Sequence, residues 1–159
     1  MKKQTQPLSL VPYSLEYLDL SWHWLNDPEI RELTMTPAFT REQQRAFFES
    51  LACRTNYHVW GVALDGKPIG AAGLKNQRNE LAEYWGYLGE KEYWGMGLGR
   101  ELILLVEDKA MELGLSSLEL KVSKKNLHAI RLYQSMGFVT DETMSNDYVL
   151  KMVKRSIQC

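Results

Sequence analysis

Three glycines at alternate positions, Gly95, Gly97 and Gly99, lie in the segment YWGMGLGREL, directly ahead of an apolar, helix-like run. Glycine has no side chain to cover the backbone, so an anion can come within hydrogen-bond distance of these N–H groups. The N-terminal end of a helix adds a positive partial charge at the same place. The segment therefore predicts a phosphate site built from main-chain amides.

The glycine spacing separates this segment from two common phosphate-binding loops. A Walker loop requires G-x-x-x-x-G-K-[ST], and the chain contains no such run. A dinucleotide-binding turn requires G-x-G-x-x-G, but the third glycine here comes one position early, at Gly99. The next expected strand runs into KVSKK and not into the acidic residue that such a turn needs. These differences disfavour a nucleotide hydrolase and a dinucleotide-dependent oxidoreductase.

A second pattern follows in VSKKNLHAIRLYQSMGF, where an Asn opens a short helix and Leu-Tyr and Gly-Phe pairs close it. Together the two patterns resemble the motifs of the GNAT superfamily of acetyl-CoA-dependent N-acetyltransferases, and neither pattern alone would be specific. The family's first motif, [R/Q]-x-x-G-x-[G/A], carries Arg or Gln where this chain has Trp94. Because backbone amides make most of the phosphate contacts, we expect Trp94 to weaken coenzyme A binding without abolishing it.

The resemblance implies where acetyl-CoA would bind. The end of the strand before the glycines would pair its backbone with the pantetheine arm, as an added strand does. The amides that open the helix would hold the pyrophosphate, and an asparagine of the second motif would contact the arm. The implied cofactor-binding residues are Leu88, Gly89, Trp94, Gly95, Met96, Gly97, Leu98, Gly99, Arg100 and Asn126. No metal ligand is implied.

Acetyl transfer to an amine requires a neutral nitrogen, a donor for the oxyanion and a proton for the departing thiolate. An alkylamine has a pKa of about 10.4, so a base or a water relay must remove its proton. Glu83 is the predicted base because it lies on the strand ahead of the glycines. A backbone N–H at the splayed strand would stabilise the oxyanion. The resemblance implies that Tyr133 protonates the thiolate.

Other bases remain open. Glu80, His58 and His128 are titratable alternatives, although a solvated or structural role suits each of them as well. Deprotonation through water alone would need no dedicated side chain. The sequence therefore leaves the identity of the base as a hypothesis.

The acceptor is predicted from the first third of the chain. The stretch WLNDPEIRELTMTPAFTREQQRAFFESL resembles enzymes that acetylate a UDP- or TDP-linked amino sugar and enzymes that acetylate ribosomal-protein N-termini. The first resemblance is favoured, and a nucleotide-linked amine is the expected partner. Arg31, Arg41, Trp22 and Tyr84 are candidates to receive the uridine and its phosphates, and Trp85 is a candidate to line the acceptor cleft. A non-catalytic acyl-CoA-binding module is the alternative from another class.

The elements that must position these residues form one α/β (α+β) domain, expected over residues 1–159. Strands are predicted at 7–13, 59–64, around 67–74, 80–89, 118–122, 138–139 and 148–153, and helices at 14–34, 40–52, 98–113 and 126–136. Asp65-Gly66 predicts a hairpin turn, the polar run NQRN at 76–79 predicts a further turn, and Thr40 with Gln43 predicts a capping box. Asp27 as N-cap and Pro28 at the first helical position predict that the chain restarts a helix there. The helix at 98–113 is expected to bury one apolar stripe, formed by Leu98, Leu102, Leu105, Val106, Ala110 and Leu113. The resemblance implies a central mixed, largely antiparallel sheet of six to seven strands with helices on both faces. It also implies a V-shaped splay between the fourth and fifth strands.

Composition bounds the function further. The 159 residues are 45% apolar with a formal net charge of −1, which argues against a nucleic-acid partner. Cys53 and Cys159 form neither a disulfide framework nor a zinc pattern. No signal peptide or membrane-spanning run is read, so we expect a cytoplasmic protein. A homodimer is left open.

Overall fold

One mixed sheet of seven strands runs through residues 8–157, the part of the chain that the computed structural model describes. The strands are β1 (Leu8–Pro12), β2 (His58–Leu64), β3 (Lys67–Arg78), β4 (Leu81–Leu88), β5 (Ser117–Ser123), β6 (Val139–Thr140) and β7 (Val149–Arg155). Their order in the sheet is β1-β2-β3-β4-β5-β7-β6, and among them β4 and β5 alone run parallel. The predicted mixed, largely antiparallel sheet is therefore confirmed.

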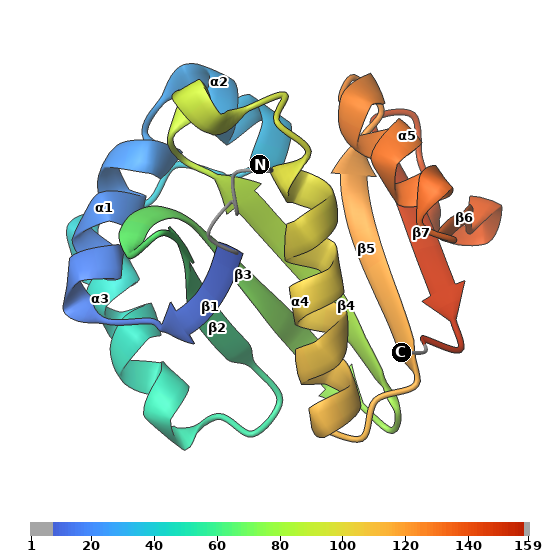
Figure 1. Cartoon of the computed structure of the whole chain (residues 1–159), viewed down its shortest axis with the longest axis horizontal. Helices are drawn as coiled ribbons and strands as arrows, with labels where there is room; N and C mark the ends of the chain where they lie inside the picture. Colours follow the sequence, from blue (N-terminus) through green and yellow to red (C-terminus); the bar gives the residue numbers. More distant parts are fainter. Residues whose placement is uncertain (1–7, 158–159) are drawn as a thin grey trace, which may run out of the picture.

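Five α-helices connect these strands. They are α1 (Leu15–Leu25), α2 (Pro28–Thr34), α3 (Arg41–Ser50), α4 (Leu98–Glu112) and α5 (Leu127–Ser135). Short 3-10 turns are η1 (Leu51–Cys53), η2 (Lys91–Tyr93) and η3 (Glu142–Met144). Figure 1 shows that the helices α1 to α3 gather beside β1 to β3, whereas α5 lies beside β5 and β7.

Helices cover both faces of the sheet, as expected. Tyr17 of α1 lies over Gly61 of β2, where an added Cβ would sit 2.4 Å from the tyrosine ring. Leu102 of α4 lies over Gly86 of β4. The register places Gly61 on the same face as Tyr87, the neighbour of Gly86, so the two glycines face opposite sides of the sheet. Helices α1 and α4 therefore enclose the sheet between them.

The apolar stripe of α4 supplies much of the core. Leu98, Leu102, Val106 and Ala110 are buried at helical spacing, as the sequence predicts. Leu113, which was expected to continue the stripe, is 38% exposed. The helix ends at Glu112, because the chain reverses through a left-handed glycine directly after Leu113.

Predicted turn and cap signals are confirmed. Asp65 and Gly66 both have positive φ angles, 51° and 78°, which is the geometry of a type I′ turn, and they join β2 to β3. The Thr40 side chain accepts from the Gln43 N–H while the Gln43 side chain accepts from the Thr40 N–H, which completes the capping box of α3.

The predicted N-cap Asp27 and first-position Pro28 are confirmed, because Asp27 accepts from the N–H groups of Glu29 and Ile30, and the region 14–34 holds two helices. One boundary differs from the expectation. Strand β3 runs on to Arg78, whereas the sequence suggested a polar turn from Asn76 to Asn79. A left-handed Asn76 absorbs an irregularity in the β3–β4 register, so pairing resumes beyond it.

The predicted splay between the fourth and fifth strands is confirmed. Strands β4 and β5 pair over three rungs, from Leu81–Ser117 to Glu83–Glu119, and diverge beyond them. Figure 1 shows the two strands separating toward the end where α4 begins. The backbone of β4 beyond Glu83 therefore has no strand partner on its β5 side.

Candidate functional site

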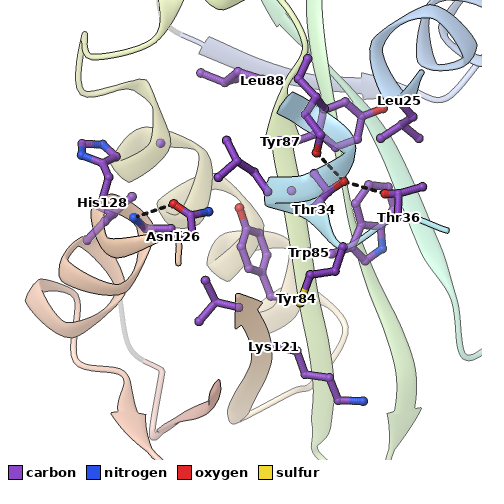
Figure 2. A pocket seen from close by; sticks show the side chains of 18 of the residues that line it. Leu25, Thr34, Thr36, Tyr84, Trp85, Tyr87, Leu88, Lys121, Asn126 and His128 are labelled. Atoms are coloured by element: carbon purple, nitrogen blue, oxygen red, sulfur yellow. Dashed lines mark hydrogen bonds between the residues drawn. The ribbon is translucent and has the colours of Figure 1, made fainter. Parts of the chain in front are cut away.

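A cleft of about 1380 Å³ opens where β4 and β5 separate. Figure 2 shows Asn126 and His128 on one wall, across from Thr34 and Tyr87 on the other. Most of the predicted site residues line this cleft, namely Leu88, Trp94, Gly95, Gly97, Leu98, Gly99, Arg100, Asn126 and Tyr133. Three predicted residues are not part of its lining: Glu83, Gly89 and Met96.

The glycine segment leaves its backbone bare. Gly95 and Gly97 have φ angles of 77° and 80°, and a Cβ added to either would meet no heavy atom within 4 Å. Gly97 is the N-cap of α4 and provides no side chain to cap the first turn. The first N–H groups of the helix therefore lie at the cleft with no capping side chain from the described part of the chain. This cradle fits a diphosphate, which supplies the oxygens that the amides need.

Trp94 ties the glycine segment to the end of β4. Its indole Nε1 donates to the Leu88 carbonyl oxygen at 2.9 Å, and the ammonium of Lys91 lies 5.7 Å from the ring centroid. An Arg or Gln at this position would be free to reach an anion, whereas the indole is held in place by its contact with β4. Trp94 therefore stabilises the loop from within, where the family motif has a polar side chain.

Lys91 joins the same segment to the corner between α1 and α2. Its ammonium lies 2.8 Å from Asp27 Oδ2 and 2.9 Å from Glu29 Oε1. The indole of Trp24 donates to Glu90 Oε2 at 3.3 Å. Asp27 thus caps α2 and binds the loop before α4 at once.

The free edge of β4 presents alternate backbone groups to the cleft. The Gly89 N–H donates to the Ile69 carbonyl of β3 at 2.7 Å. In an antiparallel ladder this alternation turns the N–H and C=O groups of Gly86 and Leu88 to the other side, toward β5. Because β5 has already diverged there, the Gly86 groups and the Leu88 N–H have no strand partner. Gly89, expected to pair with a ligand, is engaged within the sheet by its amide.

Asn126 begins α5 and also lines the cleft. Its Oδ1 accepts from the Ala129 N–H at 3.3 Å, so the asparagine of the second motif is the N-cap of the helix (Figure 2). The capping interaction fixes the side chain at the cleft wall. The structure thereby gives the motif a local structural reason in addition to its expected ligand contact.

Two tyrosines meet beneath the opening. The rings of Tyr84 and Tyr133 are edge to face, with centroids 6.3 Å apart and an interplanar angle of 79°. Both line the cleft, and neither hydroxyl has a hydrogen-bond partner among the described residues. Burial raises the pKa of Tyr133 to about 12 and places that of Tyr84 well above its usual value. Both hydroxyls are therefore protonated at neutral pH and can act as donors.

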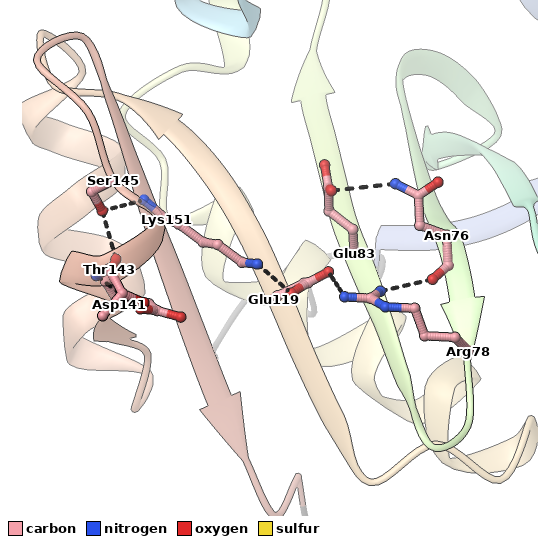
Figure 3. Close-up of polar contacts among 8 residues, drawn as sticks. All are labelled: Asn76, Arg78, Glu83, Glu119, Asp141, Thr143, Ser145 and Lys151. Atoms are coloured by element: carbon pink, nitrogen blue, oxygen red, sulfur yellow. Dashed lines mark hydrogen bonds and ion pairs between the residues drawn. The ribbon is translucent and has the colours of Figure 1, made fainter.

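Glu83 and Glu119 are register partners at the last rung before the strands diverge (Figure 3). Both are buried. Glu119 is held closely, by Arg78 at 2.6 Å and Lys151 at 3.0 Å. Burial acts to raise the pKa of Glu119, but the hydrogen bonds from these two cations outweigh it, and the pKa lies below its usual value.

The contacts of Glu83 are longer than those of Glu119. Lys75 lies 3.5 Å from its Oε2, and the Asn76 amide donates to its Oε1 at 3.4 Å. Lys75 lines the cleft although Glu83 does not. The predicted base therefore lies one side chain behind the cleft wall and is loosely held there.

The alternative bases are placed apart from one another. His58 Nε2 lies 2.9 Å from Gln77 Oε1, its ring stacks on Trp60, and it lies outside the lining of the main cleft. Glu80 is exposed in the β3–β4 turn. His128 is exposed on α5 and lines the cleft beside Asn126.

Three residues expected to receive a uridine diphosphate do not line the cleft. Arg41 pairs with Asp19 at 2.7 Å and stacks on Trp22 on the outer surface. Arg31 donates to the Leu25 carbonyl. The expectation for Arg31, Arg41 and Trp22 is therefore corrected, because intramolecular partners within the helices hold them. Tyr84 and Trp85 do line the cleft.

Sequence reasoning missed a hydroxyl cluster on the helical side of the cleft. Tyr13 and Tyr87 both donate to Ser21 Oγ, at 2.9 Å and 3.2 Å. All three line the cleft, together with Phe39, Phe47 and Tyr57. These residues come from four separate segments and form no motif, so no spacing in the sequence could have brought them together.

Within residues 8–157, no group of three or more His, Cys, Asp or Glu side chains is placed to hold a metal ion. No helix in the same range is long and apolar enough to cross a membrane. Cys53 is exposed, and Cys159 lies outside the described residues.

Comparison with known proteins identifies acetyltransferases as relatives of this chain. The model of the family described as "Acetyltransferase (GNAT) family" matches residues 20–138. Alpha/beta-tubulin-N-acetyltransferase 9 from Mus musculus is 26% identical over 146 residues, and that from Homo sapiens is 28% identical over 153. The matches cover 81% and 86% of this chain, which spans 60% of the mouse and 74% of the human protein.

Solved structures share the fold. Spermidine N-acetyltransferase from Vibrio cholerae, in complex with CoA and spermine, superposes with a TM-score of 0.83 at 20% identity, covering 94% of this chain and 95% of that one. N-acetyltransferase PseH from Campylobacter jejuni, in complex with acetyl coenzyme A, superposes with a TM-score of 0.73 at 20% identity, covering 93% and 98%.

Proposed function

Because the chain belongs to the acetyltransferase (GNAT) family, we propose that it transfers the acetyl group of acetyl-CoA to the amino group of a UDP- or TDP-linked amino sugar. The observation that carries the proposal is that one cleft has two walls of different chemistry. One wall is the bare glycine cradle at the start of α4, and the other is an aromatic, hydroxyl-bearing surface.

Acetyl-CoA fits the first wall by its chemistry. The amides from Gly95 to Arg100 would hold the pyrophosphate, and Asn126 would contact the arm. The free backbone groups of Gly86 and Leu88 would pair with the pantetheine amides, as a partner strand would. Acetyl-CoA supplies an activated thioester; the residues of this chain supply its alignment.

The residues at the opening of the V suit acetyl transfer. An N–H group of the free β4 edge would stabilise the oxyanion that develops on the acetyl carbonyl. The Tyr133 hydroxyl, protonated because its pKa is about 12, would donate a proton to the departing sulfur. The amine would attack from the side of the cleft that Trp85 lines.

Glu83 is proposed as the base that receives the proton of the amine. Its carboxylate is buried, and its two polar contacts are 3.4 Å and 3.5 Å long, so its oxygens retain free lone pairs. The carboxylate does not line the cleft, so a water molecule would carry the proton past Lys75. This water relay joins the two hypotheses that the sequence left open.

The second wall suits a sugar nucleotide. Aromatic rings stack on flat bases and on sugar faces, and the lining includes Phe39, Phe47, Tyr57 and Trp85. The Ser21 cluster adds hydroxyl groups that can exchange hydrogen bonds with a sugar. This match of chemistry, together with the sequence resemblance, supports the amino sugar as acceptor.

The amino terminus of a protein is the second candidate acceptor. It is supported by the likeness to alpha/beta-tubulin-N-acetyltransferase 9 over 81% of this chain. A peptide would have to enter the same cleft in extended form with its N-terminal amine at the opening of the V.

An acetylation screen distinguishes these proposals. The protein is incubated with acetyl-CoA and UDP-linked amino sugars, TDP-linked amino sugars or N-terminal peptides, and products are read by mass. We expect a gain of one acetyl group on a nucleotide-linked amino sugar. Acetylation of peptides alone would favour the second candidate. Coenzyme A binding without acetylation of any amine would instead indicate a non-catalytic acyl-CoA-binding module.

A further inference from the structure

The face of the sheet that the acceptor would approach carries three polar side chains at the cleft: Lys75, Trp85 and Lys121. Lys75 lies directly opposite Glu83 on β4, and Trp85 is two residues further along the same strand. Lys121 lies two residues beyond Glu119, the β5 register partner of Glu83. Side chains alternate along a strand, so all three residues share one face of the sheet. We call them the acceptor-face residues.

The described lining of the cleft contains no Asp or Glu side chain. The two carboxylates closest in the register to the acceptor-face residues are already matched by cations, Glu83 by Lys75 and Glu119 by Arg78 and Lys151 (Figure 3). Each of these carboxylates is therefore already balanced in charge, so that Glu83, although it can accept a proton through water, offers no unbalanced negative charge to a substrate ammonium.

Lys121 adds a positive charge that nothing balances. Its ammonium forms no ion pair or side-chain hydrogen bond with any residue in the range 8–157, and the residue is exposed at the cleft. Its cross-strand neighbour on β7 is Lys151, a second cation. An anionic group in the cleft would be attracted to Lys121 with no competing internal partner.

Trp85 also favours a ligand oxygen at this face of the sheet. Its Nε1 is buried and completes no hydrogen bond with the described residues, although the Tyr57 hydroxyl lies near it. A buried donor that completes no hydrogen bond is unfavourable. A ligand oxygen, and not a ligand ammonium, would satisfy it.

We infer that Lys121 determines acceptor specificity by binding an anionic oxygen group, a phosphate or carboxylate, carried by the amine substrate. The inference deepens the proposed function and rests on it. It also predicts that polyamines are poor substrates, because Lys121 would repel their second ammonium group and no carboxylate lines the cleft to bind it.

The test compares Lys121→Met with Lys124→Met, an exposed lysine three residues away that does not line the cleft. Two acceptors are used with each variant: the UDP-linked amino sugar, and the same amino sugar without its nucleotide. We expect Lys121→Met to raise KM for the UDP-linked acceptor about tenfold, the loss of one charge-assisted contact. KM for acetyl-CoA and for the amino sugar without its nucleotide should change less than about twofold. Lys121→Arg should restore most of the loss.

Binding of UDP itself separates this inference from the proposed function. Calorimetry with coenzyme A present should give a UDP Kd about tenfold weaker in Lys121→Met than in Lys124→Met. Equal effects of the two substitutions, or acetylation of spermidine more efficient than that of the UDP-linked sugar, would overturn the role of Lys121. Failure of the native chain to acetylate any sugar nucleotide, with UDP binding still sensitive to Lys121, would overturn the proposed acceptor and leave the anion site standing.

Discussion

Tyr84 and Tyr133 meet edge to face, with ring centroids 6.3 Å apart, beneath the point where β4 and β5 separate. One residue comes from the sheet and the other from α5, so the contact joins the two motif-bearing halves of the chain. Both residues line the cleft, neither hydroxyl has a hydrogen-bond partner within residues 8–157, and burial keeps both protonated. Proton donation to a departing sulfur is consistent with this arrangement.

Replacing Tyr133 by Phe should lower kcat about 10- to 100-fold. The effect lies at the low end for a general acid because a thiolate, with a thiol pKa of about 8.5, leaves readily. KM for acetyl-CoA should be almost unchanged. Because the pKa of Tyr133 is about 12, the wild-type pH–rate profile should show no alkaline fall from this group below that range.

Tyr84→Phe is the matched control for that prediction. It removes a second buried hydroxyl from the same contact and keeps the ring. A kcat that falls only in Tyr133→Phe identifies Tyr133 as the donor, whereas a fall confined to Tyr84→Phe would contradict the assignment.

Gly97→Ala should raise KM for acetyl-CoA about tenfold or more. The new methyl would meet no protein atom within 4 Å and would project beside the amides that we expect to bind the pyrophosphate. The positive φ also strains any L-residue by about 1–2 kcal/mol. Steady-state kinetics and thermal unfolding should be measured on the same preparations.

Gly114→Ala isolates the strain. Gly114 has a φ of 81°, has equal space around it, and lies outside the cleft lining. Gly114→Ala should lower Tm by about as much as Gly97→Ala does, because both substitutions strain a positive φ, but it should leave KM for acetyl-CoA unchanged. A KM increase of the same size in both variants would show that strain, and not blocked access, explains Gly97→Ala.

Glu83→Gln should lower kcat about 100-fold if the carboxylate receives the proton of the amine. Glu119→Gln is the control, because Glu119 is equally buried and is the register partner of Glu83, but its oxygens are occupied by Arg78 and Lys151. Similar kcat values in wild type and Glu83→Gln would leave water as the sole relay.

Glu119 should make stability depend on acid pH. Its folded-state pKa lies below the ordinary value of 4.5, so its contribution is present above that value and is lost as pH falls through the lower folded-state value. Thermal unfolding of wild type and Glu119→Gln should therefore differ most near neutral pH and converge in acid. A difference that persists unchanged in acid would assign the effect to packing.

Local chemistry made much of the fold predictable. Asp65-Gly66 needs no tertiary contact to favour its turn, and Thr40 and Gln43 cap α3 from within three residues. The extent of β3 was not predictable in this way. Asn76 looks like a turn residue, and the continuation of the strand beyond it depends on pairing with β4, which is a long-range interaction.

In the candidate site, too, the features set by local sequence were predictable and those set by long-range contacts were not. The glycine segment and Asn126 were found because short motifs encode a helix N-terminus and its cap. Ser21 and Tyr57 were missed because the cleft that they share exists only after distant segments of the chain assemble. Arg31 was selected for its charge, but the structure turns it toward the Leu25 carbonyl.

The pairing of Lys91 with Asp27 and Glu29 has a consequence for engineering. Exchanging the helices at 14–50 for those of another enzyme, as a way to change the amine that is accepted, would also remove both carboxylates that anchor the loop before α4. Such chimeras would gain a new acceptor pocket but bind acetyl-CoA more weakly, unless Asp27 and Glu29 were kept in the exchanged segment.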